Sequence, residues 1–231
     1  MNPKDPSPAQ FPDTRWSLIQ QVGNDEDRLQ EWCRGYWRPI RNYICARGHS
    51  PDQANELTQQ FFENLLGKDR QNILPTTLSG AFRAYLKQSI KNFLIDQWRS
   101  SHSQKNKGNR PHLDIDDTPL ESQTASSDLA FDRAWVITLL QLAMDRLEVE
   151  MTKADNLELF EALSPLVDGS TPDTTQADLA QKHGMSDGAF RVALHRFRQR
   201  FRHHIEEEIR QTVSTKSALD EEIRNLLTLW S

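Results

Sequence analysis

Cysteine is scarce in this sequence. Cys33 and Cys45 are the two cysteines of the 231-residue chain, they lie twelve positions apart, and no CxxC pair occurs. Disulfide frameworks need more cysteines, and structural zinc sites need cysteines or histidines at short, recurring spacings. The histidines form no metal-ligating pattern with cysteine or carboxylate, and no glycine-rich phosphate loop or nucleophile–base pair can be recognised. We therefore expect a reducing compartment, no metal, no cofactor and no catalytic activity.

Long apolar runs are also missing. Hydrophobic residues make up 36% of the chain, and no stretch approaches the roughly 20 apolar residues that cross a bilayer. The N-terminus, MNPKDPSPAQFPD, is rich in proline and lacks the apolar core of a signal peptide. We expect residues 1–12 to be disordered, and the protein to be cytoplasmic with no membrane partner.

Glycine is infrequent, and strand patterns are absent. The chain has nine glycines, and no segment alternates convincingly between apolar and polar residues. Apolar residues instead recur three or four positions apart, which is typical of helices. The pattern predicts an all-α fold, with helices over residues 14–22, 27–48, 51 to about 67, 78–100, 128–150, 155–167, 174–183 and 186–205, and an amphipathic helix in the tail.

Composition also predicts the domain organisation. Residues 101–127 are poor in apolar residues and rich in polar and turn residues, which favours a flexible linker. This linker would join two helical domains, residues 13–100 and residues 128–205. A helical extension over residues 206–231 would follow the second domain.

Charge is distributed unevenly along the chain. The net charge of −5 argues against a simple polyanion-binding protein. Residues 134–175 carry two basic and eight acidic groups, whereas residues 176–205 carry six basic and two acidic groups. A short basic block inside an acidic protein is typical of a localised nucleic-acid contact.

That basic block has the pattern of a helix-turn-helix. In QADLAQKHGMSDGAFRVALHRFRQRFR, residues 176–202, Gly184 supplies a turn that needs positive φ, and Ser186 caps the second helix. Apolar residues from Phe190 to Phe201 repeat on one face of this helix, and basic residues repeat on another. A solvated basic helix in a generic bundle is the alternative. The residues predicted to contact DNA bases or phosphates are Ser186, Asp187, Gly188, Arg191, Val192, His195, Arg196, Arg198 and Arg202.

The helix predicted over residues 78–100 carries a second candidate surface. Its apolar face runs from Phe82 to Trp98, and Arg83 begins a basic stripe. Cations next to aromatic rings suit a single or melted DNA strand, because bases stack on rings while cations follow phosphates. The alternative is that the rings face the core and the charges are merely solvated. The candidate contacts are Lys87, Lys91, Asn92, Asp96 and Arg99.

These segments, in this order, resemble the extracytoplasmic function sigma factors, which direct bacterial RNA polymerase to promoters. The similarity lies in QANELTQQFFENLL, in FRAYLKQSIKNFLIDQWRS and in the helix-turn-helix, and it covers about residues 27–202 without the linker. It implies core RNA polymerase and promoter DNA as partners, and an anti-sigma factor as a further candidate. It also implies that the first domain opens the minus-10 element, that Asn92, Asp96 and Arg99 read a flipped-out base, and that the second domain reads the minus-35 element.

The resemblance raises a question about the helix that begins after Ser50, the residue predicted to be its N-cap. In the family, acidic residues on this helix face polymerase. Here Glu56 is the one acid among the corresponding residues, so we expect unmodified docking to be weak. The residues of this polymerase-binding face are Gln53, Asn55, Glu56, Gln59 and Gln60.

One hypothesis is that a Ser/Thr protein kinase adds the missing charge by phosphorylating Thr58, as is thought for family subgroups that lack the acids. A phosphothreonine carries about two negative charges at neutral pH. Helical-wheel geometry, however, places Thr58 near the centre of the apolar side, so a packing role is the alternative. Ser50 is a second candidate for phosphorylation.

Two other functions are compatible with these patterns. A stand-alone helix-turn-helix transcriptional regulator would bind duplex DNA tightly without polymerase, and it would not need the surface on residues 78–100. A phosphorylation-dependent interaction protein would titrate a partner and never initiate transcription.

Overall fold

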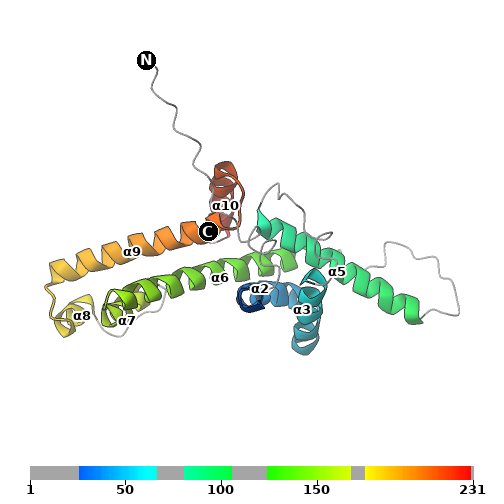
Figure 1. Cartoon of the computed structure of the whole chain (residues 1–231), viewed down its shortest axis with the longest axis horizontal. Coiled ribbons are helices and arrows are strands. Elements are labelled where there is room, and N and C mark those ends of the chain that lie inside the picture. Colours follow the sequence, from blue (N-terminus) through cyan, green and yellow to red (C-terminus); the bar gives the residue numbers. More distant parts are fainter. Residues whose placement is uncertain (1–25, 67–80, 106–123, 168–174, 230–231) are drawn as a thin grey trace, which may run out of the picture. The chain divides into compact units, whose positions relative to one another are not determined.

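The chain is built from helices (Figure 1). The computed structural model describes residues 26–66, 81–105, 124–167 and 175–229, and no strand occurs within these ranges. The all-α prediction is confirmed for this part of the chain, whereas the predictions for residues 1–22 lie outside it. The helices are α2 (Glu26–Ala46), α3 (Pro51–Leu66), α5 (Phe82–Lys105), α6 (Thr124–Lys153), α7 (Leu157–Leu163), the short 3-10 helix η2 (Ser164–Leu166), α8 (Gln176–Lys182), α9 (Asp187–Arg210) and α10 (Lys216–Thr228).

None of the described helices has the length and apolar character that crossing a membrane requires.

The described helices extend into both ends of the predicted linker. Helix α5 runs on through residues 101–105, and α6 already includes residues 124–127, so both ends of the predicted linker are helical. These ends contain no glycine or proline, whereas Gly108, Pro111 and Pro119 lie between them. Polar residues without a helix breaker continue a helix at little cost, so the helices extend beyond the apolar pattern.

The described residues group into two compact units. The first unit comprises residues up to Thr138 together with residues from Arg210 onward, and the second unit comprises Leu139–Ile209. The unit boundaries therefore fall inside α6 and near the end of α9, whereas the sequence placed the domain boundary in residues 101–127. In chain order, the second unit is an insertion into the first. The C-terminal extension belongs with the N-terminal helices, since its Glu222 pairs with Arg83 of α5 and its Thr212 carbonyl accepts from Phe82 N.

The first unit has an aromatic core. Trp135 of α6 stacks on Tyr36 of α2 with 5.0 Å between ring centroids, and it also stacks on Phe131 at 5.8 Å. Phe82 of α5 meets the ring of Tyr36 edge-on at 5.4 Å. Each of these four side chains is at most 1% exposed. Aromatic packing of this kind joins the start of α6 to α2 and α5, which explains why the first turns of α6 belong to the first unit.

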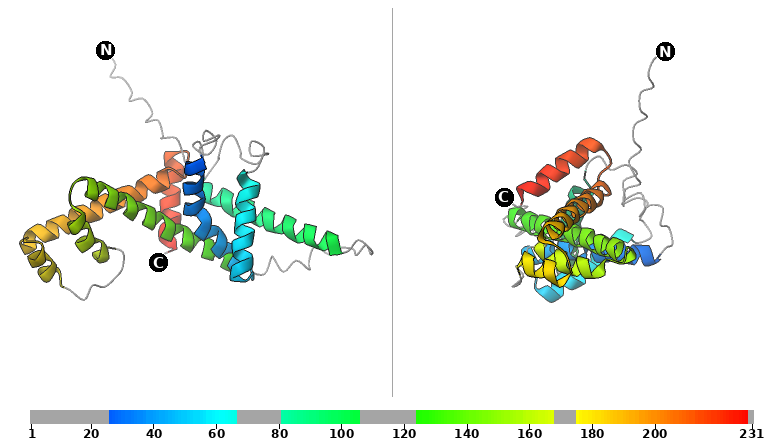
Figure 2. Two further views of the ribbon diagram at one scale, coloured as in Figure 1. Left: turned by 60° about the horizontal axis from the view of Figure 1, so that its bottom comes forward. Right: turned by 90° about the vertical axis from the view of Figure 1, so that its left-hand side faces the viewer.

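The second unit is formed by α7, α8 and α9 packed against the second half of α6, and the left view of Figure 2 shows α9 (yellow to orange) crossing α6 (green). The apolar face predicted for residues 186–205 is confirmed, since Phe190, Leu194, Phe197 and Phe201 are all buried. The buried core comprises Ala143, Leu147, Met151, Phe160, Leu163, Ala180, Phe190, Leu194, Phe197 and Phe201.

Candidate nucleic-acid interface

Local hydrogen bonds define how α8 and α9 begin. The side chain of Thr175 caps α8 in a reciprocal capping box, because its hydroxyl accepts from Asp178 N at 3.2 Å and its own N–H donates to the Asp178 carboxylate at 3.3 Å. Gly184 adopts φ +62° in the turn, and the Ser186 hydroxyl accepts from Ala189 N at 3.2 Å. The roles predicted for Gly184 and Ser186 are therefore confirmed.

The outward side of α9 is open and basic. No described side chain forms an ion pair with Arg191, Arg196 or Arg202, and Arg198 reaches the Leu166 carbonyl at 3.5 Å. By contrast, Arg200, which the sequence did not single out, lies 3.6 Å from the Glu150 carboxylate. All nine residues predicted to contact DNA in this segment are exposed, namely Ser186, Asp187, Gly188, Arg191, Val192, His195, Arg196, Arg198 and Arg202.

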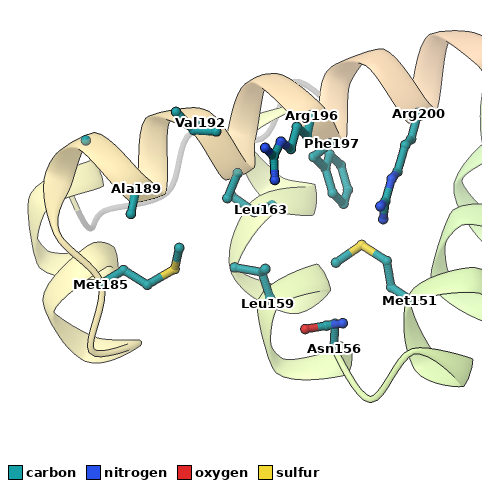
Figure 3. Close-up of a pocket in the computed structure, with 12 residues that line it drawn as sticks. Met151, Asn156, Leu159, Leu163, Met185, Ala189, Val192, Arg196, Phe197 and Arg200 are labelled. Atoms are coloured by element: carbon teal, nitrogen blue, oxygen red, sulfur yellow. The ribbon is translucent and has the colours of Figure 1, made fainter.

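A groove of about 500 Å³ lies beside the first half of α9 (Figure 3). Arg196 and Arg200 project from α9 on the side of this groove, and Met151, Asn156 and Leu159 lie across from them. Its remaining lining residues are Leu163, Met185, Gly188, Ala189, Val192, Ala193 and Phe197.

The groove divides the nine predicted contacts into two sets. Gly188, Val192 and Arg196 line it, and the other six form an open face next to it. Spacing along one helix could not reveal this division, because the opposite wall of the groove comes from α6 and α7.

A second pocket, of about 360 Å³, lies between α3 and α5. Its volume is near the lower end of the roughly 300–1,000 Å³ that small-molecule pockets span. Asn92 and Asp96, two of the predicted minus-10 residues, line this pocket together with aromatic rings. The complete lining is Phe61, Asn64, Leu65, Tyr85, Gln88, Ser89, Asn92, Phe93 and Asp96.

Some polar groups of the α3–α5 pocket form hydrogen bonds or ion pairs along α5. The Gln88 amide donates to Asn92 Oδ1 at 2.8 Å, and Asp96 lies 3.8 Å from Arg99 in an exposed pair. Tyr85 is half-buried; burial raises the pKa of its hydroxyl, and a hydrogen bond with Ser89 opposes that rise. Sequence reasoning missed Tyr85 and Gln88, because only the approach of α3 makes them part of a pocket.

The basic stripe predicted on α5 is not open along its whole length. Arg83 is only 8% exposed, and its guanidinium pairs with Asp132 of α6 and with both carboxylate oxygens of Glu222 of α10, at 2.6 and 3.0 Å for the latter. Lys87 Nζ lies 3.0 Å from the second oxygen of Asp132. Of the three cations, Lys91 is the one for which no described partner is seen.

The environment of Arg83 also affects its proton affinity. Burial by itself lowers the pKa of this guanidinium, but the hydrogen bonds and negative charges of Glu222 and Asp132 outweigh burial and raise it. The expectation that Arg83 belongs to an exposed basic stripe is therefore wrong, because two acids from distant segments cover it.

The predicted polymerase-binding face of α3 is accessible and locally hydrogen-bonded. Ser50 forms the predicted cap: its hydroxyl accepts from Gln53 N at 3.3 Å, and its N–H donates to Gln53 Oε1 at 3.1 Å. Asn55 Oδ1 accepts from Arg41 Nε of α2 at 2.6 Å. Gln53 and Asn55 are both exposed.

The remaining residues of this face pair within α3. Gln59 donates to Glu63 at 2.9 Å, and Gln60 donates to Glu56 at 3.2 Å. Glu56 and Gln59 are exposed, whereas Gln60 is half-buried. The face is thus a nearly neutral surface whose amides already have protein partners.

Thr58 points the other way. Its side chain is 0% exposed, and Oγ1 donates to the Ala54 carbonyl at 2.6 Å in the preceding helical turn. The helical-wheel placement of Thr58 on the inner side is confirmed. A kinase could reach this hydroxyl only after α3 has moved away from its neighbours, so phosphorylation of Thr58 stays a prediction with that added requirement.

Comparisons of the chain with protein-family models, with curated proteins and with solved structures give no match.

Proposed function

We propose that this chain is a bacterial sigma factor of the extracytoplasmic function type, which directs core RNA polymerase to promoter DNA and helps to open it. The observation that carries the proposal is that the two units bear two different surfaces suited to nucleic acid. One is the open basic face of α9, and the other is the aromatic and amide-lined pocket between α3 and α5. The sequence resemblance to that family supports the same function.

The α9 surface suits duplex DNA. We propose that α8 and α9 form a helix-turn-helix, with α9 as the recognition helix in the major groove of a minus-35 element. Ser186, Asp187 and Arg191 lie in its first turns, where recognition helices reach base edges, and Arg198 and Arg202 lie further along, where phosphates are within reach.

The α3–α5 pocket suits one unstacked base. Tyr85 and Phe93 offer ring surface, and Asn92 and Asp96 offer an amide and a carboxylate that can pair with a base edge. We propose that this pocket holds a flipped-out base of the minus-10 strand, with Lys91 and Arg99 near its phosphates. Lys87 would join them only if it were released from Asp132.

Docking to polymerase would involve the exposed face of α3. With Glu56 as the one acid among its five residues, this face offers little charge to a basic partner surface. The proposal therefore includes weak docking by the unmodified chain, relieved either by phosphorylation at Thr58 or by another regulator. Polymerase supplies the chemistry, and the chain has none of its own.

The test is run-off transcription with core RNA polymerase on a promoter selected by this protein. The variants are the wild type and a helix with restored charge, Gln53→Asp/Asn55→Glu/Gln60→Glu, whose new Asn55→Glu side chain would face Arg41. Specific transcripts from the restored helix, and few from the wild type, support a sigma factor limited by its docking charge. Full activity of the wild type would remove the need for phosphorylation and leave the sigma function in place.

Matched substitutions test the two DNA surfaces. Asn92→Ala should weaken promoter opening, whereas Gln97→Ala, an exposed amide on the same helix outside the pocket, should not. Arg191→Ala should weaken duplex binding more than Arg200→Ala, because Arg200 is already paired with Glu150. Tight, specific duplex binding without polymerase, and no transcripts with it, would instead identify a stand-alone helix-turn-helix regulator.

A further inference from the structure

Four charged side chains meet inside the first unit where three helices converge. Arg83 and Lys87 come from α5, Asp132 comes from α6, and Glu222 comes from α10. Glu222 is 2% exposed and Asp132 is 8% exposed, so the acids are as deeply buried as Arg83. We refer to these four residues as the α5–α6–α10 ion network.

The network cancels two of the three positive charges in the first half of α5, those of Arg83 and Lys87. Its two cations and two anions sum to zero, and every one of them has a partner within 3.0 Å. The guanidinium of Arg83 presents its fork to Glu222 through Nε and Nη2, which is the same planar geometry that binds a phosphate. The Glu222 carboxylate thus fills a guanidinium fork whose geometry also suits a phosphate.

The C-terminal segment, residues 210–229, is held against α5 by more than charge. The Thr212 carbonyl accepts from Phe82 N at 2.8 Å, at the first residue of α5. Val213, Leu219 and Leu226 are buried, and Thr215 caps α10 by accepting from Ala218 N at 3.2 Å. The segment is a packed element with an ordered start, and its attachment point is the N-terminal end of the proposed strand-binding helix.

We propose that the C-terminal segment is an autoinhibitory element. Together with Asp132 it masks Arg83 and Lys87, and so it prevents these two cations of α5 from binding the phosphates of single-stranded DNA. Undocking of α10 would remove Glu222 and leave Arg83 and Lys87 sharing the single carboxylate of Asp132, so that one net positive charge becomes available to phosphate. This inference rests on the proposed role of α5 in binding a melted strand. It adds an internal competitor for that strand, Glu222, which lies 139 positions from Arg83 in the sequence.

The salt dependence of single-stranded DNA binding reports how many cations contact phosphates, and it therefore tests whether Arg83 and Lys87 are masked. Each cation that neutralises a phosphate of a single strand adds about 0.7 to the slope of log K against log salt. The experiment follows the fluorescence anisotropy of a labelled 20-nucleotide single-stranded DNA between 50 and 300 mM NaCl with the full chain. The doubly substituted Glu222→Gln/Asp132→Asn protein should have a slope steeper than that of the wild type by about 1.4, for two released cations.

The control removes the same charge from the same segment without touching the network. Asp220→Asn/Glu221→Gln replaces two exposed acids on α10, next to Glu222. The slope of this control should stay close to that of the wild type. A network variant with an unchanged slope, or a control as steep as the network variant, would overturn the masking.

Lys87→Gln provides a second and milder readout, since its side chain lies near the surface. In the wild-type background it should leave the slope unchanged, because Lys87 is already occupied by Asp132. In the Glu222→Gln/Asp132→Asn background it should remove about 0.7. If circular dichroism shows that the Glu222→Gln/Asp132→Asn protein does not fold, the test is Lys87→Gln in the wild-type background. An unchanged slope of log K against log salt then supports the masking, and a slope lower by about 0.7 overturns it.

Run-off transcription separates this inference from the proposed function. Promoter-specific transcripts from the wild type, combined with an unchanged slope in the network variant, would leave the sigma function standing and overturn the autoinhibition. A steeper slope in the network variant, with no transcripts from any form including the charge-restored α3 helix, would support the masking and overturn the sigma function.

Discussion

Replacing Thr58 by glutamate should destabilise the first unit. The Thr58 side chain is 0% exposed, and its neighbour on the preceding turn, Ala54, is 0% exposed as well. A carboxylate placed there would lose its hydration, and Arg41, the cation described at α3, is bonded to Asn55 on the exposed side of the helix. An unpaired buried charge costs several kcal/mol, out of the roughly 5–15 kcal/mol that stabilise a typical protein. We expect the free energy of unfolding to fall by about 3 kcal/mol or more.

Thr58→Val is the matched control. Valine keeps the shape of threonine and removes the hydroxyl. That hydroxyl donates to the Ala54 carbonyl, which lies one turn earlier and is also an acceptor for the backbone hydrogen bonds of the helix. The loss should stay within about 1 kcal/mol. Urea unfolding of the full chain, followed by far-UV circular dichroism, measures both variants against the wild type.

The reasoning would be refuted if the glutamate variant unfolded within about 1 kcal/mol of the valine variant. Such a result would mean that the inner side of α3 opens readily, and a kinase could then reach Thr58 without further assistance. A large loss of stability would mean that transcription by the glutamate variant cannot be interpreted as simple charge restoration. The substitutions at Gln53 and Asn55, which are exposed, and at Gln60, which is half-buried, do not place a charge at a fully buried position.

Three further outcomes are expected. Arg83→Met should lower the free energy of unfolding by about 3–5 kcal/mol, because it leaves the buried Glu222 carboxylate without its charge partner. Adding Glu222→Leu should restore most of this loss, as measured by urea unfolding. Simply additive losses would contradict this reasoning. Asp155→Gly should raise the free energy of unfolding by about 0.5 kcal/mol, because Asp155 holds φ +58° just after α6, a conformation that glycine adopts more easily. Thermal melts measure this change, and a melting temperature below that of the wild type would contradict it. Burial, opposed by a backbone hydrogen bond, raises the pKa of the Cys33 thiol to about 11. At pH 8 about a thousandth of this thiol is therefore ionised, and iodoacetamide should alkylate Cys33 slowly in a Cys45→Ser protein. Rapid alkylation would contradict the raised pKa.

The pKa of Cys33 also has a consequence for stability. Its folded-state pKa, about 11, lies above the ordinary value of 9.0. The contribution of the neutral thiol to stability is therefore fully present below pH 9 and is lost as the pH rises from about 9 to about 11. Replacing Cys33 by alanine should flatten the fall of stability over this pH range.

The helices themselves could be read from the sequence. The caps at Ser50 and Ser186, the turn at Gly184 and the buried faces of α5 and α9 were all predicted, because each depends on residues within a few positions of one another. The exposure of the basic residues on α9 follows from the same periodicity, since one buried stripe determines which side of the helix remains outside.

The tertiary structure alone decided what these faces meet. No periodicity in α5 could indicate that Arg83 is covered by Glu222, 139 positions away, because helical spacing reports which side of a helix is inward and not which segment packs there. The same holds for the pocket between α3 and α5 and for the groove opposite Arg196, whose walls come from separate helices. It also holds for the division into units, where buried aromatic residues place the start of α6 with α2 and α5, and the Arg83–Glu222 ion pair places α10 there as well.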